Sequence, residues 1–203
     1  LGRTSFSLTQ IRKTVNSIGG NSFENNSNMM RCINAICDSC AILSKERTGA
    51  LIVIERSTRL GDIIATGTLV DASPSAELIR NIFFKNYPLH DGAMVIRDGR
   101  VHAAGCFLPL SNNYDISRTL GTRHRAALGM SENSDAIVVI VSEETGIISM
   151  AKNGVLIRRL DRQNLFNLLQ EEIVPPAEDE EADISPLQKL LRKGGALNHG
   201  KPE

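Results

Sequence analysis

Apolar residues recur along this 203-residue chain with helical spacing in several separate segments. In residues 162–173, for example, Leu165, Leu168 and Leu169 fall on one face of a helix with 3.6 residues per turn. Ser73, which is followed by Pro74, and Thr122 are the expected N-caps of two other helices. The pattern predicts helices at 5–18, at 29–46, at 73–83, from residue 122 onward, and at 162–173.

Short apolar runs between these helices indicate buried β-strands. They occupy residues 50–54, 93–96, 101–110, 136–141, 147–151 and 155–157. Asp98-Gly99 and Asn153-Gly154 each lie between two runs, where such pairs predict tight hairpins. Because hairpins join antiparallel strands, a plain parallel doubly wound sheet is excluded. The predicted fold class is α/β, with a single mixed β-sheet flanked by helices on both sides.

The chain divides into one folded domain and two flanking segments. Residues 1–27 are expected to form an N-terminal helix followed by a Gly/Asn/Ser-rich loop, which covers 19–28. Residues 28–174 are expected to form the domain, and 56–71 is a polar connection within it. Residues 175–203 are acidic, then basic and Gly-rich, and are expected to be disordered. The chain begins at Leu1, so we expect it to be a piece of a longer protein.

Charge and cysteine content narrow the classes of protein. The 23 basic and 23 acidic residues cancel, which argues against a strongly basic nucleic-acid-binding protein. Cys37 and Cys40 have the spacing of a metal or redox pair, but they lie near the apolar face of a predicted helix and no second pair follows. Buried, reduced thiols are therefore expected, as in a cytosolic compartment. No apolar run approaches the roughly 20 residues that span a bilayer.

One basic stretch, Thr122-Arg123-His124-Arg125, lies at a predicted helix start. A helix N-terminus offers free backbone N–H groups and a partial positive charge, which suit an anion. Arginine guanidinium groups add donors in a fixed fork that matches phosphate oxygens. The alternative interpretation is an ordinary helix start with a solvated basic face.

Three further stretches carry polar or aromatic groups near strand ends. Asp91 and the adjacent His90 could bind a divalent metal together, or Asp91 could act as a general base. Gly92 would let a substrate approach the backbone closely. The alternative is a simple turn. Residues 142–146 follow a buried strand, and the ends of buried strands are where open α/β sheets place their sites. The alternative is an exposed acidic turn. Phe107 and Leu108 either belong to the core or enclose a flat base.

Together these stretches suit a nucleoside triphosphate bound with Mg²⁺ or Mn²⁺. The chain contains neither a P-loop sequence nor the protein-kinase signatures, so phosphate would be bound by a different arrangement.

Asp91-Gly92-Ala93 and Arg123-His124-Arg125 resemble the two signature motifs of the diadenylate cyclase domain family. The resemblance covers roughly residues 28–173 and is specific, because separate segments agree in order and spacing. The matching segments are 49–56, 88–93, 107–111, 121–127 and 141–146. The helix expected at 5–18 is similar to that of membrane-linked members, in which transmembrane helices precede the domain. That similarity implies a protein at the cell membrane, with the domain facing the cytoplasm.

The resemblance implies an enzyme that converts two ATP into cyclic di-AMP and two pyrophosphates in a head-to-head homodimer, with Mg²⁺ or Mn²⁺. It implies that Asp91 helps activate the attacking ribose 3′-hydroxyl, and that His90, Asp91 and Glu144 hold the metal. The ATP-binding residues that it implies are Gly92, Ala93, Phe107, Leu108, Thr122, Arg123, His124, Arg125 and Ser142. Of these, it implies that Arg123, His124 and Arg125 are also catalytic, together with Asp91.

A non-catalytic module that senses ATP or cyclic di-AMP is the alternative. The intact Asp91 disfavours it, because binding alone does not require a base at that position.

Overall fold

A seven-stranded mixed sheet forms the centre of the computed structural model, which describes residues 8–112 and 120–174. The sheet order is β2-β4-β3-β1-β5-β6-β7, and only β1 and β3 pair in parallel. The strands are β1 (Ala50–Ile54), β2 (Thr68–Ala72), β3 (Ala93–Arg97), β4 (Arg100–Cys106), β5 (Ile137–Val141), β6 (Ile148–Lys152) and β7 (Val155–Leu160). The prediction of one mixed sheet is confirmed.

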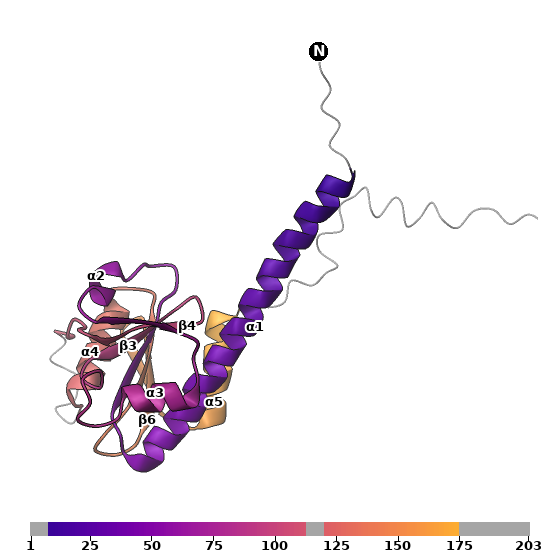
Figure 1. The fold of residues 1–203 in the computed structure, drawn as a ribbon. Helices are drawn as coiled ribbons and strands as arrows, with labels where there is room; N and C mark the ends of the chain where they lie inside the picture. Colours follow the sequence, from indigo (N-terminus) through magenta and orange to yellow (C-terminus); the bar gives the residue numbers. More distant parts are fainter. Residues whose placement is uncertain (1–7, 113–119, 175–203) are drawn as a thin grey trace, which may run out of the picture.

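Helices cover both faces of this sheet, as Figure 1 shows. One face packs against α1 (Leu8–Glu46), α3 (Ala76–Ile82) and α5 (Arg162–Ile173). The other face packs against α4 (Thr122–Glu132) and the short α2 (Gly61–Ile64). The predicted flanking by helices on both sides is therefore confirmed.

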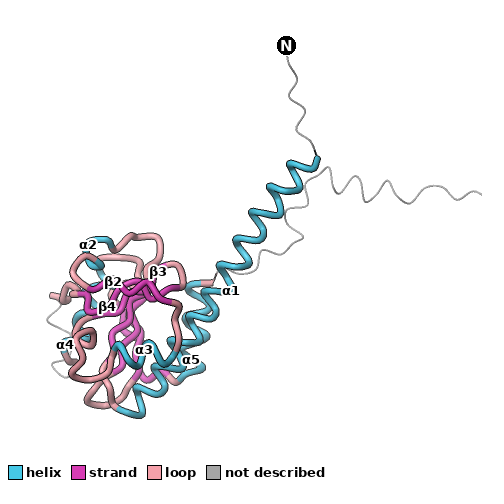
Figure 2. The backbone as a smooth tube through the Cα atoms, in the orientation of Figure 1, coloured by secondary structure: helices cyan, strands magenta, loops and turns pink. Residues whose placement is uncertain are grey.

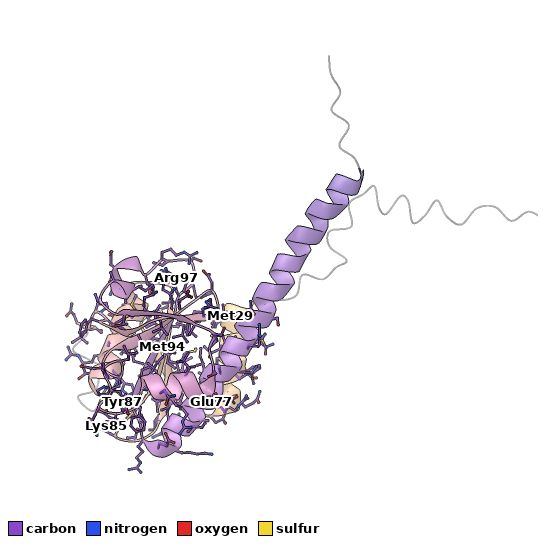
Figure 3. All side chains as sticks on the ribbon, viewed as in Figure 1. Met29, Glu77, Lys85, Tyr87, Met94 and Arg97 are labelled. Carbon is purple, nitrogen blue, oxygen red and sulfur yellow. The ribbon has the colours of Figure 1, made fainter. Side chains whose placement is uncertain are left out.

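Alternate residues of the central strand β1 point into the two halves of the core. Ile52 and Ile54 join the cluster under α1, α3 and α5, whereas Leu51 and Val53 join the cluster under α4. In Figure 3, Met94 of β3 lies inside the body of the domain. Because both faces are covered, β1 is buried along its whole length, whereas the edge strand β7 is mostly exposed or half-buried.

Helix α1 is continuous and 39 residues long, so the predicted loop at 19–28 is wrong. Its C-terminal part packs against the sheet, α3 and α5, while its N-terminal part projects away from the domain (Figures 1 and 2). A glycine in a helix costs about 1 kcal/mol relative to alanine, which weakens a helix without ending it, and no proline interrupts this one. Among the described residues, no helix has the length and apolar character needed to cross a membrane.

Two helix starts, one connection and one strand end differ from the prediction. The strand predicted at 101–110 ends at Cys106. Ser75, not Ser73, caps α3, because its extended backbone lets its hydroxyl accept the N–H of Leu78 at 3.1 Å. Helix α4 has Gly121 at its N-cap and Thr122 as its first residue, so the predicted Thr122 cap is wrong. The predicted polar connection at 56–71 contains α2 and most of β2.

Both predicted hairpins are present. Asp98-Gly99 joins β3 to β4 and Asn153-Gly154 joins β6 to β7, and all four residues have positive φ. This conformation is the one that a two-residue turn with the strand twist requires.

The four cysteines are buried and unpaired, as predicted. Burial raises the pKa of the Cys32 and Cys37 thiols to about 12, so neither is a thiolate at neutral pH. The predicted tail at 175–203 lies outside the described residues.

Candidate active site

The topology brings the chemistry-bearing segments to one end of the sheet. Strands β1 and β3 are parallel, so both start at the same end. Strands β4 and β5 are antiparallel to them and finish there, where Cys106 pairs with Ala93 and Val141 pairs with Ala50. The loop before β3, the loop after β4 and the turn after β5 therefore meet at this end, beside the N-terminus of α4.

A cavity of about 540 Å³ lies between these segments. It is lined by Leu51, Asp91, Gly92, Cys106, Phe107, Leu108, Leu110, Gly121, Thr122, Arg123, His124, Ala126, Val141, Ser142, Glu143, Glu144, Thr145 and Arg158. Nine of the twelve residues predicted for the site lie on its wall; Ala93, Arg125 and His90 do not. The volume is typical of a small-molecule site.

The start of α4 supplies the basic wall of the cavity. Thr122, Arg123 and His124 line it, and their helix presents its positively polarised N-terminus there. The Arg123 Nη1 atom lies 2.8 Å from the Glu143 Oε2 atom. Arg125 is exposed outside the cavity, and its carbonyl accepts the N–H of Ser111. Any contact of the Arg125 side chain with a ligand therefore stays a prediction.

His124 is only 5% exposed, and its Nε2 atom has no hydrogen-bond partner among the described residues. Burial lowers the pKa of this imidazole, and the positive charge of Arg158 lowers it further. The ring is therefore neutral at physiological pH, with one nitrogen free to meet a ligand.

The acidic side of the cavity consists of two segments. Asp91 is exposed at the wall, before β3, and Ser142 to Thr145 form the turn after β5. The Ser142 Oγ atom accepts the Thr145 N–H at 3.3 Å, which holds this turn together.

Gly92 has a φ of +106°, and an added Cβ would lie 2.8 Å from the Cys106 carbonyl oxygen. The glycine is therefore required by the close packing of the chain on the end of β4. The predicted close approach of a nucleotide to Gly92 is not tested by this packing and stays a prediction.

The predicted metal ligands are only partly brought together. Asp91 and Glu144 share the cavity, but His90 lies outside it, and its Nδ1 atom is 2.6 Å from the Tyr87 carbonyl oxygen. The described residues contain no group of three or more His, Cys, Asp or Glu side chains placed to hold an ion. Two carboxylates still fit Mg²⁺, which is commonly held by one or two carboxylates together with substrate phosphates.

An apolar strip, made of Phe107 and Leu108, lines part of the cavity. Phe107 is 67% exposed, so the interpretation of Phe107 as core is wrong. Its N–H donates to the Thr66 Oγ1 atom at 2.9 Å, which ties the end of β4 to the segment after α2. Gly129 of α4 lets the next loop pack closely, because an added Cβ would lie 2.3 Å from the Pro109 carbonyl oxygen.

Sequence reasoning assigned no role to several wall residues, and Arg158 is the most informative of them. It lies on β7, which β5 and β6 separate from β1, in a run whose pattern indicates only an ordinary strand. It forms no ion pair or side-chain hydrogen bond within the described part of the chain. Only the strand order, which the sequence pattern does not reveal, brings this cation beside His124.

Comparison with known proteins places this geometry in a family. The model of the DAC family, described as DisA bacterial checkpoint controller nucleotide-binding, matches residues 37–156. The cyclic di-AMP synthase CdaA of Bacillus subtilis is 44% identical over 169 residues, which are 80% of this chain and 62% of that protein. A diadenylate cyclase of Listeria monocytogenes is 46% identical over 142 residues, which are 70% of this chain and 52% of that protein. The chain thus spans between half and two thirds of these relatives.

Solved structures agree with the sequence matches. A double mutant of DacA from Staphylococcus aureus is 46% identical, with a TM-score of 0.69 over 71% of this chain and 96% of that one. A hypothetical membrane spanning protein from Bacillus cereus is 44% identical, with a TM-score of 0.60 over 62% of each chain. With its fold, its two motifs and the cavity between them, this chain belongs to the DAC family of nucleotide-binding domains.

Proposed function

We propose that this chain is a diadenylate cyclase, which condenses two ATP into cyclic di-AMP and releases two pyrophosphates. The observation that carries the proposal is the meeting of Asp91, the Arg123-His124 pair and the Ser142–Thr145 turn around one cavity of nucleotide size. These groups come from three distant parts of the sequence. The two curated relatives above bear names for the same activity.

The proposed substrate position follows from the charges on the wall. The triphosphate lies against the N-terminus of α4, where Arg123, His124 and Thr122 provide donors, and Ser142 faces it from the turn after β5. Adenine lies against the apolar strip of Phe107 and Leu108. Ala93 and Arg125 lie off the wall; Ala93 contributes through its backbone at the start of β3, and Arg125 contributes from the outer side of α4.

Asp91 acts as the general base. Its carboxylate accepts the proton of a ribose 3′-hydroxyl as the 3′-oxygen bonds to the α-phosphorus of the other ATP and the bond from that phosphorus to the pyrophosphate oxygen breaks. Arg123 and His124 stabilise the charge on the phosphate oxygens during this displacement. Asp91 and Glu144, with His90 nearby, are the proposed holders of Mg²⁺ or Mn²⁺. When bound, the ion neutralises phosphate charge.

A homodimer completes the reaction. One cavity holds one ATP, whereas the product contains two identical linkages related by a two-fold axis. Two copies facing each other head to head place each 3′-hydroxyl against the other copy's α-phosphorus. The likeness to the Bacillus cereus membrane spanning protein supports attachment to the cell membrane. The domain is proposed to face the cytoplasm. Finding the full-length protein only in the soluble fraction of lysed cells would contradict that attachment.

The test is incubation with ATP and Mn²⁺ or Mg²⁺, followed by chromatography for cyclic di-AMP and pyrophosphate in a 1:2 ratio. Asp91→Asn should still bind ATP but lose at least about 10²–10⁴-fold in turnover, because a carboxamide cannot accept the proton and is a weaker metal ligand than a carboxylate. If the wild-type dimer binds ATP and forms no product, the enzyme proposal is wrong and the chain is the sensor module.

A further inference from the structure

Gly49, the residue before β1, has no conformational need to be glycine. Its φ is not in the left-handed region, and it is buried. An added Cβ would lie 2.5 Å from the Arg123 Nη1 atom and 2.7 Å from its Cζ atom. The space that a side chain would fill is therefore occupied by the guanidinium group of Arg123.

Glu143 holds the same guanidinium from the other side. Its Oε2 atom is 2.8 Å from Arg123 Nη1 and would lie 3.1 Å from a Cβ on Gly49. The Arg123 side chain is 24% exposed and that of Glu143 is 60% exposed. An ion pair with so exposed a partner adds little to folding stability, but its geometry fixes where the guanidinium lies.

We propose that Gly49 and Glu143 are positioning residues. They hold the Arg123 guanidinium in one orientation in the cavity, so that it is in place before the phosphates of ATP bind. This inference rests on the proposed function and assigns roles to two residues outside the Asp91-Gly92-Ala93 and Arg123-His124-Arg125 motifs. A guanidinium carries five N–H donors, and the contact with Glu143 engages Nη1, which leaves donors for phosphate oxygens.

Preorganisation is the physical gain. A free arginine side chain loses much rotamer freedom when it binds a ligand, which weakens binding. The Arg123 side chain, which is held between Gly49 and Glu143, has lost this rotamer freedom before ATP binds. Because Arg123 binds the phosphates and also stabilises their charge during the displacement, loss of its fixed position should raise KM and lower kcat.

Gly49→Ala is the direct test, because its nearest clashes are with the flexible end of Arg123 and the carboxylate of Glu143 and not with backbone. The chain should fold, with Arg123 displaced. We expect about tenfold weaker binding of 3′-deoxy-ATP, a probe that cannot turn over, measured by calorimetry on the whole chain. Gly61→Ala is the matched control, since nothing lies within 4 Å of its added Cβ, and it should bind the probe as the wild type does.

A double-mutant cycle separates positioning from general distortion. In an Arg123→Ala background, Gly49→Ala should cause no further loss of affinity. If Gly49→Ala lowers the affinity for the probe equally in the wild-type and Arg123→Ala backgrounds, the role of Gly49 is overturned. Wild-type affinity of the Gly49→Ala variant would overturn it too.

Glu143 is tested by two substitutions. Glu143→Ala should weaken probe binding, and Glu143→Gln, which keeps an acceptor oxygen, should recover part of it. Tighter binding by either variant would mean that Glu143 competes with ATP for Arg123, and it would overturn the positioning role. Because the probe measures binding alone, these results stay distinct from a failure of the wild type to form cyclic di-AMP.

Discussion

His124 is held in its neutral form by its surroundings. The ring is buried beside the N-terminus of α4, and Arg158 adds a positive charge from β7. Both effects lower the pKa of the imidazole, and only the carboxylate of Glu144 opposes them. A neutral ring can approach Arg123 and a triphosphate without adding to the charge repulsion between cations.

Replacing Arg158 tests this electrostatic coupling. Arg158→Gln should raise the pKa of His124 toward its ordinary value of 6.5, because one of the two causes of the lowering is removed. NMR titration of the histidine ring protons measures the change, with His124→Gln identifying the signal. Arg159→Gln is the control, since Arg159 is the next residue along β7 and does not line the cavity. An unchanged His124 pKa in Arg158→Gln would contradict the coupling.

The same lowered pKa predicts how stability changes with pH. Between pH 6.5 and the folded pKa, the unfolded chain binds a proton at His124 that the folded chain does not. His124 therefore contributes a loss of stability as the pH falls below 6.5.

At the site, residue types could be predicted from the sequence and contacts could not. Arg123 and Asp91 could be predicted because each lies in a short motif whose neighbouring residues indicate its chemistry. The need for glycine at position 49 could not be predicted, because it depends on the side chain of Arg123, 74 residues further along the chain. Arg158 is likewise invisible until the strand order places β7 on the cavity side.

At the scale of elements, Glu55 connects β1 to its parallel neighbour β3. Its carboxylate accepts two hydrogen bonds from Arg97, one from Arg59 and one from the Leu60 N–H. Burial alone would raise the pKa of Glu55, but these bonds prevail and lower it to about 2. The carboxylate is therefore stabilised in its charged form where β1 leaves the sheet.

Glu55→Gln should lower the free energy of unfolding by about 3 kcal/mol at pH 7, the equivalent of lowering the pKa from 4.5 to about 2. Because the folded pKa is depressed, the stabilisation is present above pH 4.5 and is lost as the pH falls through about 2. Urea unfolding over a pH series measures both effects, and the variant should lack this part of the pH dependence.

Glu46→Gln is the matched control, because Glu46 also pairs with an arginine at 2.7 Å but is 45% exposed. It should cost less than about 1 kcal/mol. Equal losses for the two variants would show that burial of the Glu55 pair has no special weight.

Elements with local signals could be predicted from the sequence, and those that depend on tertiary contacts could not. Helix α5 matches its predicted range, because Asp161 caps it and its apolar spacing is regular. The hairpin at Asp98-Gly99 is also correct, since two positive φ values suit those residues. Strand β2, by contrast, is an edge strand with exposed residues and a register shift, and only its pairing with β4 defines it. Helix α1 was predicted in two pieces because local propensity alone favoured a break.

At the scale of the whole molecule, the two faces of the sheet have different roles. The cavity lies on the α4 side, where Leu51, Cys106 and Ala126 connect its wall to the core. Helices α1, α3 and α5 cover the opposite face, and α1 extends well beyond it (Figure 1). The N-terminal part of α1 therefore leaves the domain without passing across the cavity.

The open side of the cavity predicts dependence on protein concentration. Asp91, Glu143 and Glu144 are exposed there, as is Phe107, so one copy alone leaves the reacting groups uncovered. If each linkage forms between ATP molecules on facing copies, product formed per subunit should rise with protein concentration and level off once dimers dominate. Sedimentation measures the dimer fraction on the same samples, and turnover should follow it. Asp91→Asn, mixed in excess with the wild type, should lower the wild-type turnover by forming mixed pairs. A constant turnover per subunit across the range in which dimers dissociate would contradict the shared site, because a single copy would then suffice.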